Sequence, residues 1–142
     1  MDDSTVAELA FDLRAALAPI YRRLTAEKDL PLGQTRVLNA LVRHGGATSS
    51  ALAGAEHITP QSMAAIVAEL EARGYVQREQ DPDDGRRRVV RITADGREAL
   101  ERDRNAMSGW LASAIVEQLD AREVATLAAS IPVLHKLGLP RG

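Results

Sequence analysis

Residues 48–93 read TSSALAGAEHITPQSMAAIVAELEARGYVQREQDPDDGRRRVVRIT, and this stretch decides the fold of the chain. Thr48 and Thr59 stand where two short helices are predicted to begin, because a threonine hydroxyl can accept a backbone N–H of the first helical turn. Pro60 suits that first turn, since its missing N–H would have no partner there. Gly74 is expected to end the second helix, which then covers about four turns.

The second predicted helix has one apolar side and one small, polar side. Its apolar residues recur at i, i+3, i+4 and i+7, and they are expected to face a core: Met63, Ile66, Val67 and Leu70. The residues that point elsewhere are Gln61, Ser62, Ala64, Ala65 and Ala68. An outer face without bulky apolar side chains allows such a helix to lie in the major groove of DNA.

Two β-prone runs follow, residues 75–78 and 89–92, and the turn formers of residues 81–85 separate them. This pattern predicts a hairpin. Four guanidinium groups fall within six residues at and beside its tip, those of Arg86, Arg87, Arg88 and Arg91. Such a tip suits phosphates or a narrow minor groove, whose potential attracts arginine. The order of helix, helix and hairpin predicts a mainly α fold with a small β-hairpin wing, a winged helix-turn-helix.

The length fits one domain over residues 1–142 that can bury a core without a disulfide or a structural metal. No cysteine is present, which excludes disulfides and thiolate zinc sites. The net charge is −2, but residues 34–97 hold nine Lys/Arg against eight Asp/Glu, and the remainder holds nine against twelve. One Phe, two Tyr and one Trp are too few for binding single strands by base stacking.

The N-terminus starts with the acidic pair Asp2-Asp3 where a signal peptide would be basic, and no apolar run is long enough to span a membrane. We therefore expect a cytoplasmic protein with no membrane partner.

Apolar seams flank the predicted winged part, which covers residues 34–97. The N-terminal seam, with Pro19 expected to bend it, consists of Val6, Leu9, Leu13, Leu17, Ile20 and Leu24. After Thr93 a long helix to about Leu119 carries Leu100, Met107, Trp110, Leu111 and Ile115 on its apolar side. Asp120 and Glu123 form a capping box for a last helix, in which Pro132 is expected to be a break and whose seam consists of Val124, Leu127, Ile131 and Leu134.

A small central domain cannot easily bury three such helices, so residues 1–30 and 98–142 are expected to pair with a second copy. An intramolecular bundle is the alternative. The residues expected in the dimer contact are Leu9, Leu13, Leu17, Ile20, Ile115, Leu127, Ile131 and Leu134.

The chain resembles the MarR family of bacterial transcription regulators over nearly its whole length. The segments that carry the resemblance are residues 48–53, 58–63 and 70–78, and most specifically 81–87 running into 90–96. The resemblance implies a homodimer that binds pseudo-palindromic operators in double-stranded DNA through a winged helix in each subunit. Such regulators are often released by a small, frequently aromatic or phenolic, ligand. We expect no cofactor in this chain.

Carried over by position, Gln61, Ser62, Ala64 and Ala65 would face the major groove in the helix that Thr59 caps. Arg86 would enter the minor groove, with Asp84 holding its side chain. The phosphate contacts would come from Arg78, Arg87 and the hydroxyls of Thr48 and Ser49. Many relatives have hydroxyl or arginine side chains where this chain has Ala64 and Ala65, so direct base readout is expected to rest on Gln61 and Ser62.

The sequence also bears on two other functions. An enzyme is disfavoured because the sequence lacks a cysteine, a glycine-rich phosphate loop and a nucleophile-elbow serine. A winged helix that binds only proteins is the more serious alternative, since a fold does not fix a function. His44, His57 and His135 are too dispersed to predict a metal site and are expected to be ordinary, partly exposed histidines. Zinc binding, which occurs in some relatives, is the alternative. Met107 and Trp110 are expected in the core, or in a ligand cleft where the dimer helices meet the winged part.

Overall fold

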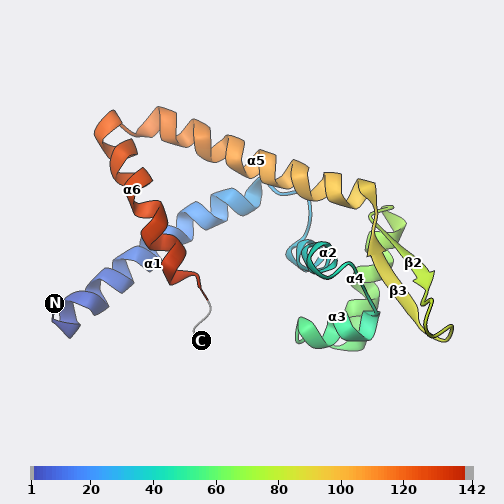
Figure 1. Cartoon of the computed structure of the whole chain (residues 1–142). Helices are drawn as coiled ribbons and strands as arrows, with labels where there is room; N and C mark the ends of the chain where they lie inside the picture. The colour runs from blue at the N-terminus through green and yellow to red at the C-terminus, as the bar shows by residue number, and fades with distance from the viewer. Residues whose placement is uncertain (1, 140–142) are drawn as a thin grey trace.

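Six helices and three short strands make up residues 2–139, the part of the chain that the computed structural model describes (Figure 1). In chain order they are α1 (Asp3–Ala26), α2 (Leu32–His44), β1 (Gly46–Ala47), α3 (Ser49–Ala55), α4 (Pro60–Ala72), β2 (Val76–Gln80), β3 (Arg88–Ile92), α5 (Ala94–Gln118) and α6 (Ala121–Leu137). The predicted winged helix-turn-helix fold is confirmed.

Side-chain caps start four of the helices at the predicted residues. Thr48 accepts the N–H of Ala51, and Thr59 accepts that of Ser62, each at 3.1 Å. The hydroxyl of Thr93 starts α5 in the same way, and Asp120 forms the predicted capping box at the start of α6. These bonds satisfy N–H groups that have no partner within the helix, so the local sequence fixes where the helices begin.

The hydrophobic core lies in the winged part, residues 34–97, and continues into the first turns of α5. Its largest fully buried side chains come from α2, α4 and β3: Val37, Leu38, Leu41, Met63, Val67, Leu70 and Val90. Val42, also in α2, is 39% exposed and lies outside this core. The predicted apolar stripe of α4 is confirmed, with Ile66 half-buried against the core.

The sheet has three antiparallel strands in the order β1-β3-β2. The predicted hairpin pairs Val76 with Ile92 and Gln80 with Arg88. Strand β1 was not predicted, because two residues carry no alternating pattern. It pairs Gly46 with Arg91 and Ala47 with Val90, and so joins the base of the wing to the end of α2.

The terminal helices extend away from the winged part, and α5 connects the two regions (Figure 1). Neither α1 nor α6 contains a buried residue. Helix α1 continues through Pro19, and α6 continues through Pro132, so the expected break at Pro132 is wrong. Proline removes only one backbone hydrogen bond, and the bonds on either side hold the helix together. Within residues 2–139, no helix is both long and apolar enough to cross a membrane.

Candidate nucleic-acid interface

Helix α4 presents the small, polar face that its sequence predicted. Gln61, Ala64 and Ala65 are exposed, while Met63 and Val67 are buried on the opposite side. Ala68 continues the exposed face by one turn. Because Ala64, Ala65 and Ala68 have short side chains, the helix backbone can approach another surface closely along this part of the face.

The hydroxyls at the helix starts already have local roles. Thr59 accepts the N–H of Ser62 and donates its own proton to the Ser62 hydroxyl oxygen at 2.9 Å. Thr59 is thereby occupied as a cap, whereas the Ser62 hydroxyl still has a proton to donate. Thr48 caps α3, and the neighbouring Ser49 is half-buried in the first turn of that helix.

Backbone hydrogen bonds shape the tip of the wing into a defined turn. The N–H of Asp81 donates to the carbonyl of Arg87 at 2.9 Å, and the N–H of Arg87 donates to that of Asp84 at 3.0 Å. The Gln80 side chain donates to the carbonyl of Gly85 at 2.8 Å. The three consecutive arginines that follow therefore leave the turn from a fixed backbone.

Asp84 acts on Arg86 differently from what the family resemblance implied. Its carboxylate accepts the backbone N–H of Arg86 at 3.1 Å, and no ion pair within residues 2–139 joins it to the guanidinium. A bond from an aspartate to the N–H two residues ahead is a common turn geometry. Asp84 thus fixes the backbone of Arg86 and leaves the direction of its side chain to other partners.

The arginines of the wing differ in whether a carboxylate already holds them. Arg91 pairs with Glu79 at 2.8 Å across β2 and β3, and Arg78 lies 3.4 Å from Glu71, with its Nε buried and making no hydrogen bond. Arg86, Arg87 and Arg88 are exposed and take part in none of the ion pairs formed within the described residues. The three tip arginines therefore have no ion-pair partner among the described residues, although Asp81, Asp83 and Asp84 lie in the same turn.

Arg73, at the C-terminal end of α4, is the centre of a polar cluster that the sequence did not predict. Its guanidinium donates to the carboxylate of Asp29 at 2.7 Å and to the side-chain oxygen of Gln34 at 3.1 Å. It also lies over the Tyr75 ring, 4.8 Å from the centroid. The hydrogen bond to Asp29 raises the pKa of Arg73, so this group stays charged at any ordinary pH.

Asp103 of α5 is the second polar group that sequence analysis missed. It is 4% exposed and accepts the backbone N–H groups of Asp29 and Leu30 at 2.9 and 3.1 Å. One signal was available, because Asp103 falls between Leu100 and Met107 in the apolar series of α5, where a carboxylate needs a buried partner.

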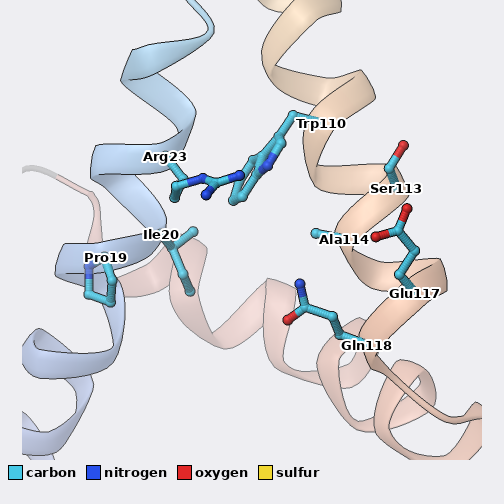
Figure 2. Close-up of a pocket in the computed structure, with 8 residues that line it drawn as sticks. All are labelled: Pro19, Ile20, Arg23, Trp110, Ser113, Ala114, Glu117 and Gln118. Carbon is cyan, nitrogen blue, oxygen red and sulfur yellow. The ribbon is translucent and has the colours of Figure 1, made fainter.

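A cavity of about 430 Å³ lies between α1 and α5, and Figure 2 shows the side chains around it. Arg23 of α1 lies over the ring of Trp110 at 5.4 Å from the centroid. The lining residues are Pro19, Ile20, Arg23, Trp110, Ser113, Ala114, Glu117 and Gln118, so Trp110 belongs to this cavity and Met107 does not. The lining combines an aromatic ring, the cation of Arg23, a hydroxyl and the carboxylate of Glu117, so a small aromatic ligand whose acidic group lies beside Arg23 could bind here.

An apolar groove of about 690 Å³ follows the seam of α1. It is lined mainly by α1 residues, among them Leu13, Leu17 and Leu24, together with Leu137 of α6. Leu9 is 60% exposed and Leu17 46%, values unusual for leucines in a regular apolar series. For metal ions, residues 2–139 contain no cluster of three His, Cys, Asp or Glu side chains.

Comparison with known proteins gives a consistent result. A model of the MarR family matches residues 28–87. An uncharacterized HTH-type transcriptional regulator from Mycobacterium leprae is 33% identical over 129 residues, which cover 88% of this chain and 90% of that protein. An HTH-type transcriptional repressor from Mycobacterium tuberculosis is 30% identical over 128 residues, covering 90% of this chain and 86% of the repressor.

Solved structures agree with this in fold. The crystal structure of a candidate transcriptional regulator from Pseudomonas aeruginosa superimposes with a TM-score of 0.82 at 34% identity, covering 99% of this chain and 100% of that one. A MepR variant from Staphylococcus aureus, solved bound to an oligodeoxyribonucleotide, has a TM-score of 0.71 and covers 90% of this chain and 96% of its own, but at 20% identity it shows only the shared fold. With the regulator from M. leprae alike over nearly the full length of both chains, this protein belongs to the MarR family of helix-turn-helix transcriptional regulators.

Proposed function

We propose that this chain is a homodimeric repressor that binds a pseudo-palindromic operator in double-stranded DNA and that a small aromatic ligand releases it. The observation that carries the DNA-binding part is the juxtaposition of two features. Helix α4 exposes a face of small and polar side chains, and the tip beside it bears Arg86, Arg87 and Arg88 without paired carboxylates. The M. tuberculosis relative is a repressor, which supports the proposed repression, and the MepR variant was solved with an oligonucleotide, which supports the proposed DNA binding.

In this proposal residues 34–97 bind DNA. Helix α4 contacts the bases in the major groove, and the wing contacts the minor groove and phosphates. Gln61 and Ser62 hydrogen-bond base edges in the major groove, where the methyl groups of Ala64 and Ala65 can contact thymine methyls. Arg86 enters the minor groove. Phosphates are bound by Arg87, Arg78 and the first turn of α3, at Thr48 and Ser49, while Thr59 serves by holding the start of α4.

Residues 1–30 and 98–142 form the dimer contact in this proposal. The exposed seam of α1 and its groove support this, because two copies would cover each other's leucines. The contact would include Leu9, Leu13, Leu17, Ile20, Ile115, Leu127, Ile131 and Leu134. A two-fold dimer would set its two α4 helices in successive major grooves, about 34–36 Å apart.

The cavity between α1 and α5 is the proposed ligand site. Trp110 offers an aromatic face and Arg23 a cation for a carboxylate or phenolate. Its position beside the α1 seam means that a ligand there would alter how the proposed dimer helices pack. Met107 lies outside the cavity lining, so the proposed ligand site includes Trp110 and not Met107.

The salt dependence of DNA binding tests the proposed function. Phosphate contacts release counterions, so the logarithm of affinity falls linearly with the logarithm of salt concentration. We expect Arg86→Ala to weaken binding to most sequences and to flatten this slope by about one unit. Arg22→Ala removes the same charge from an exposed position on α1 and serves as the matched control.

A winged helix that binds only proteins gives a different result in the same experiment. It would show weak DNA binding that Arg86→Ala and Arg22→Ala change equally. If Arg86→Ala binds as the unmodified protein does at every salt concentration, the wing is not a DNA contact, and the role assigned to Arg86 is wrong.

A further inference from the structure

We propose that Arg73 is a positioning residue, which fixes the angle of α4 against α5 and thereby the separation of the two α4 helices in the dimer. This inference rests on the proposed function, because the separation matters only for a dimer that binds two half-sites. Arg73 itself contacts no DNA in this proposal. It acts through Asp29, in the connection between α1 and α2, and through Gln34 in the first turn of α2.

The two ends of the Arg73 guanidinium reach two different elements. Nη2 donates to Asp29 at 2.7 Å, and Nη1 donates to the Gln34 oxygen at 3.1 Å. The Gln34 amide nitrogen then donates to Glu69, one turn before Arg73 in α4, at 3.0 Å. A planar guanidinium holds both acceptors in a set geometry, which a lysine ammonium cannot reproduce.

Asp29 connects this cluster to α5. Its carboxylate accepts from Arg73, while its backbone N–H donates to the buried carboxylate of Asp103. Asp103 also accepts the N–H of Leu30, so two hydrogen bonds hold the connection against α5. The path from α4 to α5 therefore passes through three residues, Arg73, Asp29 and Asp103, and each step is a charge-assisted hydrogen bond.

A second contact between the winged part and α5 shows why the Arg73 path affects orientation. At the start of α5 the Thr93 hydroxyl donates to the Gly74 carbonyl at 2.6 Å, and the Thr93 N–H donates to the Tyr75 carbonyl at 3.0 Å. One such attachment fixes a position but allows rotation about it. The Asp103 attachment lies nearly three turns further along α5, beyond the core residues Ala99 and Leu100, and this second, distant point restrains the angle of α5.

The exposure of the pair separates this role from a role in stability. The side chain of Arg73 is 33% exposed and that of Asp29 is 76% exposed. Exposed ion pairs contribute little to the stability of the folded state. Variants at either residue should therefore fold, and their effect on DNA binding can be measured in a folded protein.

The first experiment measures how strictly the protein requires one distance between half-sites. An operator is selected from random double-stranded DNA with the unmodified protein, and a second duplex carries one extra base pair at the centre. We expect the unmodified protein to bind the longer duplex about tenfold or more weakly, since one helix is then displaced and rotated. For Arg73→Ala this ratio should fall to about twofold to threefold.

Three controls separate geometry from charge. Arg36→Ala also removes one arginine and one ion pair of the winged part, that with Glu56, and it should keep the full ratio. Asp29→Asn removes a negative charge, so charge alone would strengthen DNA binding, whereas loss of positioning predicts the reduced ratio. Arg73→Lys keeps the charge and should restore the ratio only in part. An unchanged ratio in Arg73→Ala and in Asp29→Asn would overturn the proposal.

A measurement without DNA distinguishes this inference from the proposed function. The chain has no cysteine, so Ala68→Cys on the exposed face of α4 gives one spin label in each subunit. We expect a narrow distribution of label-to-label distances, which Arg73→Ala broadens and Arg36→Ala leaves unchanged. Equal widths overturn the role of Arg73 even if DNA binds as proposed. Absence of any coupling between labels overturns the dimer and the positioning role with it.

Discussion

Gln61 and Arg86 lie at the two ends of the proposed DNA surface, and their substitution should affect DNA binding differently. Gln61 is exposed in the first turn of α4, where an amide can make two hydrogen bonds to an adenine edge. Gln61→Ala should cost about 1–3 kcal/mol at one operator position and relax the preference there. Binding curves on single-base operator variants measure this. A uniform loss across all variants would show that Gln61 contacts phosphate.

Gly96 stands where the chain has no room for a side chain. A Cβ at this position would lie 2.3 Å from the Tyr75 carbonyl oxygen, where the start of α5 meets the wing. Gly96→Ala should therefore destabilise the protein by roughly 1–3 kcal/mol or more, as overpacking does. Gly54→Ala is the matched control, because no atom lies within 4 Å of its Cβ in α3. The control should be neutral or stabilising in thermal unfolding, since alanine favours helix.

At the residue scale, the sequence predicted the caps, the core side of α4 and the arginine cluster. Each of these depends on neighbours within a few positions. The Arg73 cluster could not be predicted, because Asp29 and Asp103 are 74 residues apart in the chain and meet only in the folded protein. The family resemblance implied that Asp84 holds the Arg86 side chain, whereas its carboxylate accepts the Arg86 backbone N–H here. The spacing in the sequence does not distinguish a backbone N–H from a guanidinium.

Helix α1 carries the clearest test at the scale of elements. Leu17 lines the apolar groove, and a glutamate there would be buried without a partner in the proposed dimer. Leu17→Glu should give monomers or aggregates in sedimentation, whereas Ala15→Glu, on the opposite side of α1, should remain dimeric. An unchanged dimer in Leu17→Glu would show that this seam is not the dimer contact.

Element boundaries were predictable where a residue type forces them. Threonine and aspartate caps and Gly74, which has a φ of 77°, mark helix ends by their chemistry. Strand β1 lacked such a mark, because its two residues become a strand only by pairing with β3. Pro132 led us to expect a break that the helix does not have. Its missing N–H removes one backbone hydrogen bond, but the remaining hydrogen bonds of α6 keep the helix continuous.

For the whole molecule, the proposed ligand response predicts a reciprocal effect. A phenolic acid in the cavity beside Arg23 should quench Trp110, the one tryptophan of the chain. If the acid lowers operator affinity by some factor, the operator must lower the affinity for the acid by the same factor. Fluorescence titrations with and without operator measure both. Equal ligand affinity in the two titrations would indicate a constitutive regulator. Arg23→Ala should weaken binding of the acid more than of the neutral phenol.

Helix α5 runs unbroken for 25 residues from the base of the wing to the turn before α6. At about 1.5 Å per residue it is roughly 37 Å long. A stiff rod of that length magnifies small angles: a tilt of about 5° at its outer end swings the inner end by roughly 3 Å, close to the rise of one base pair. A binding event that repacks a few side chains around Trp110 can thus take the wing out of register with its groove, without any change within the wing itself.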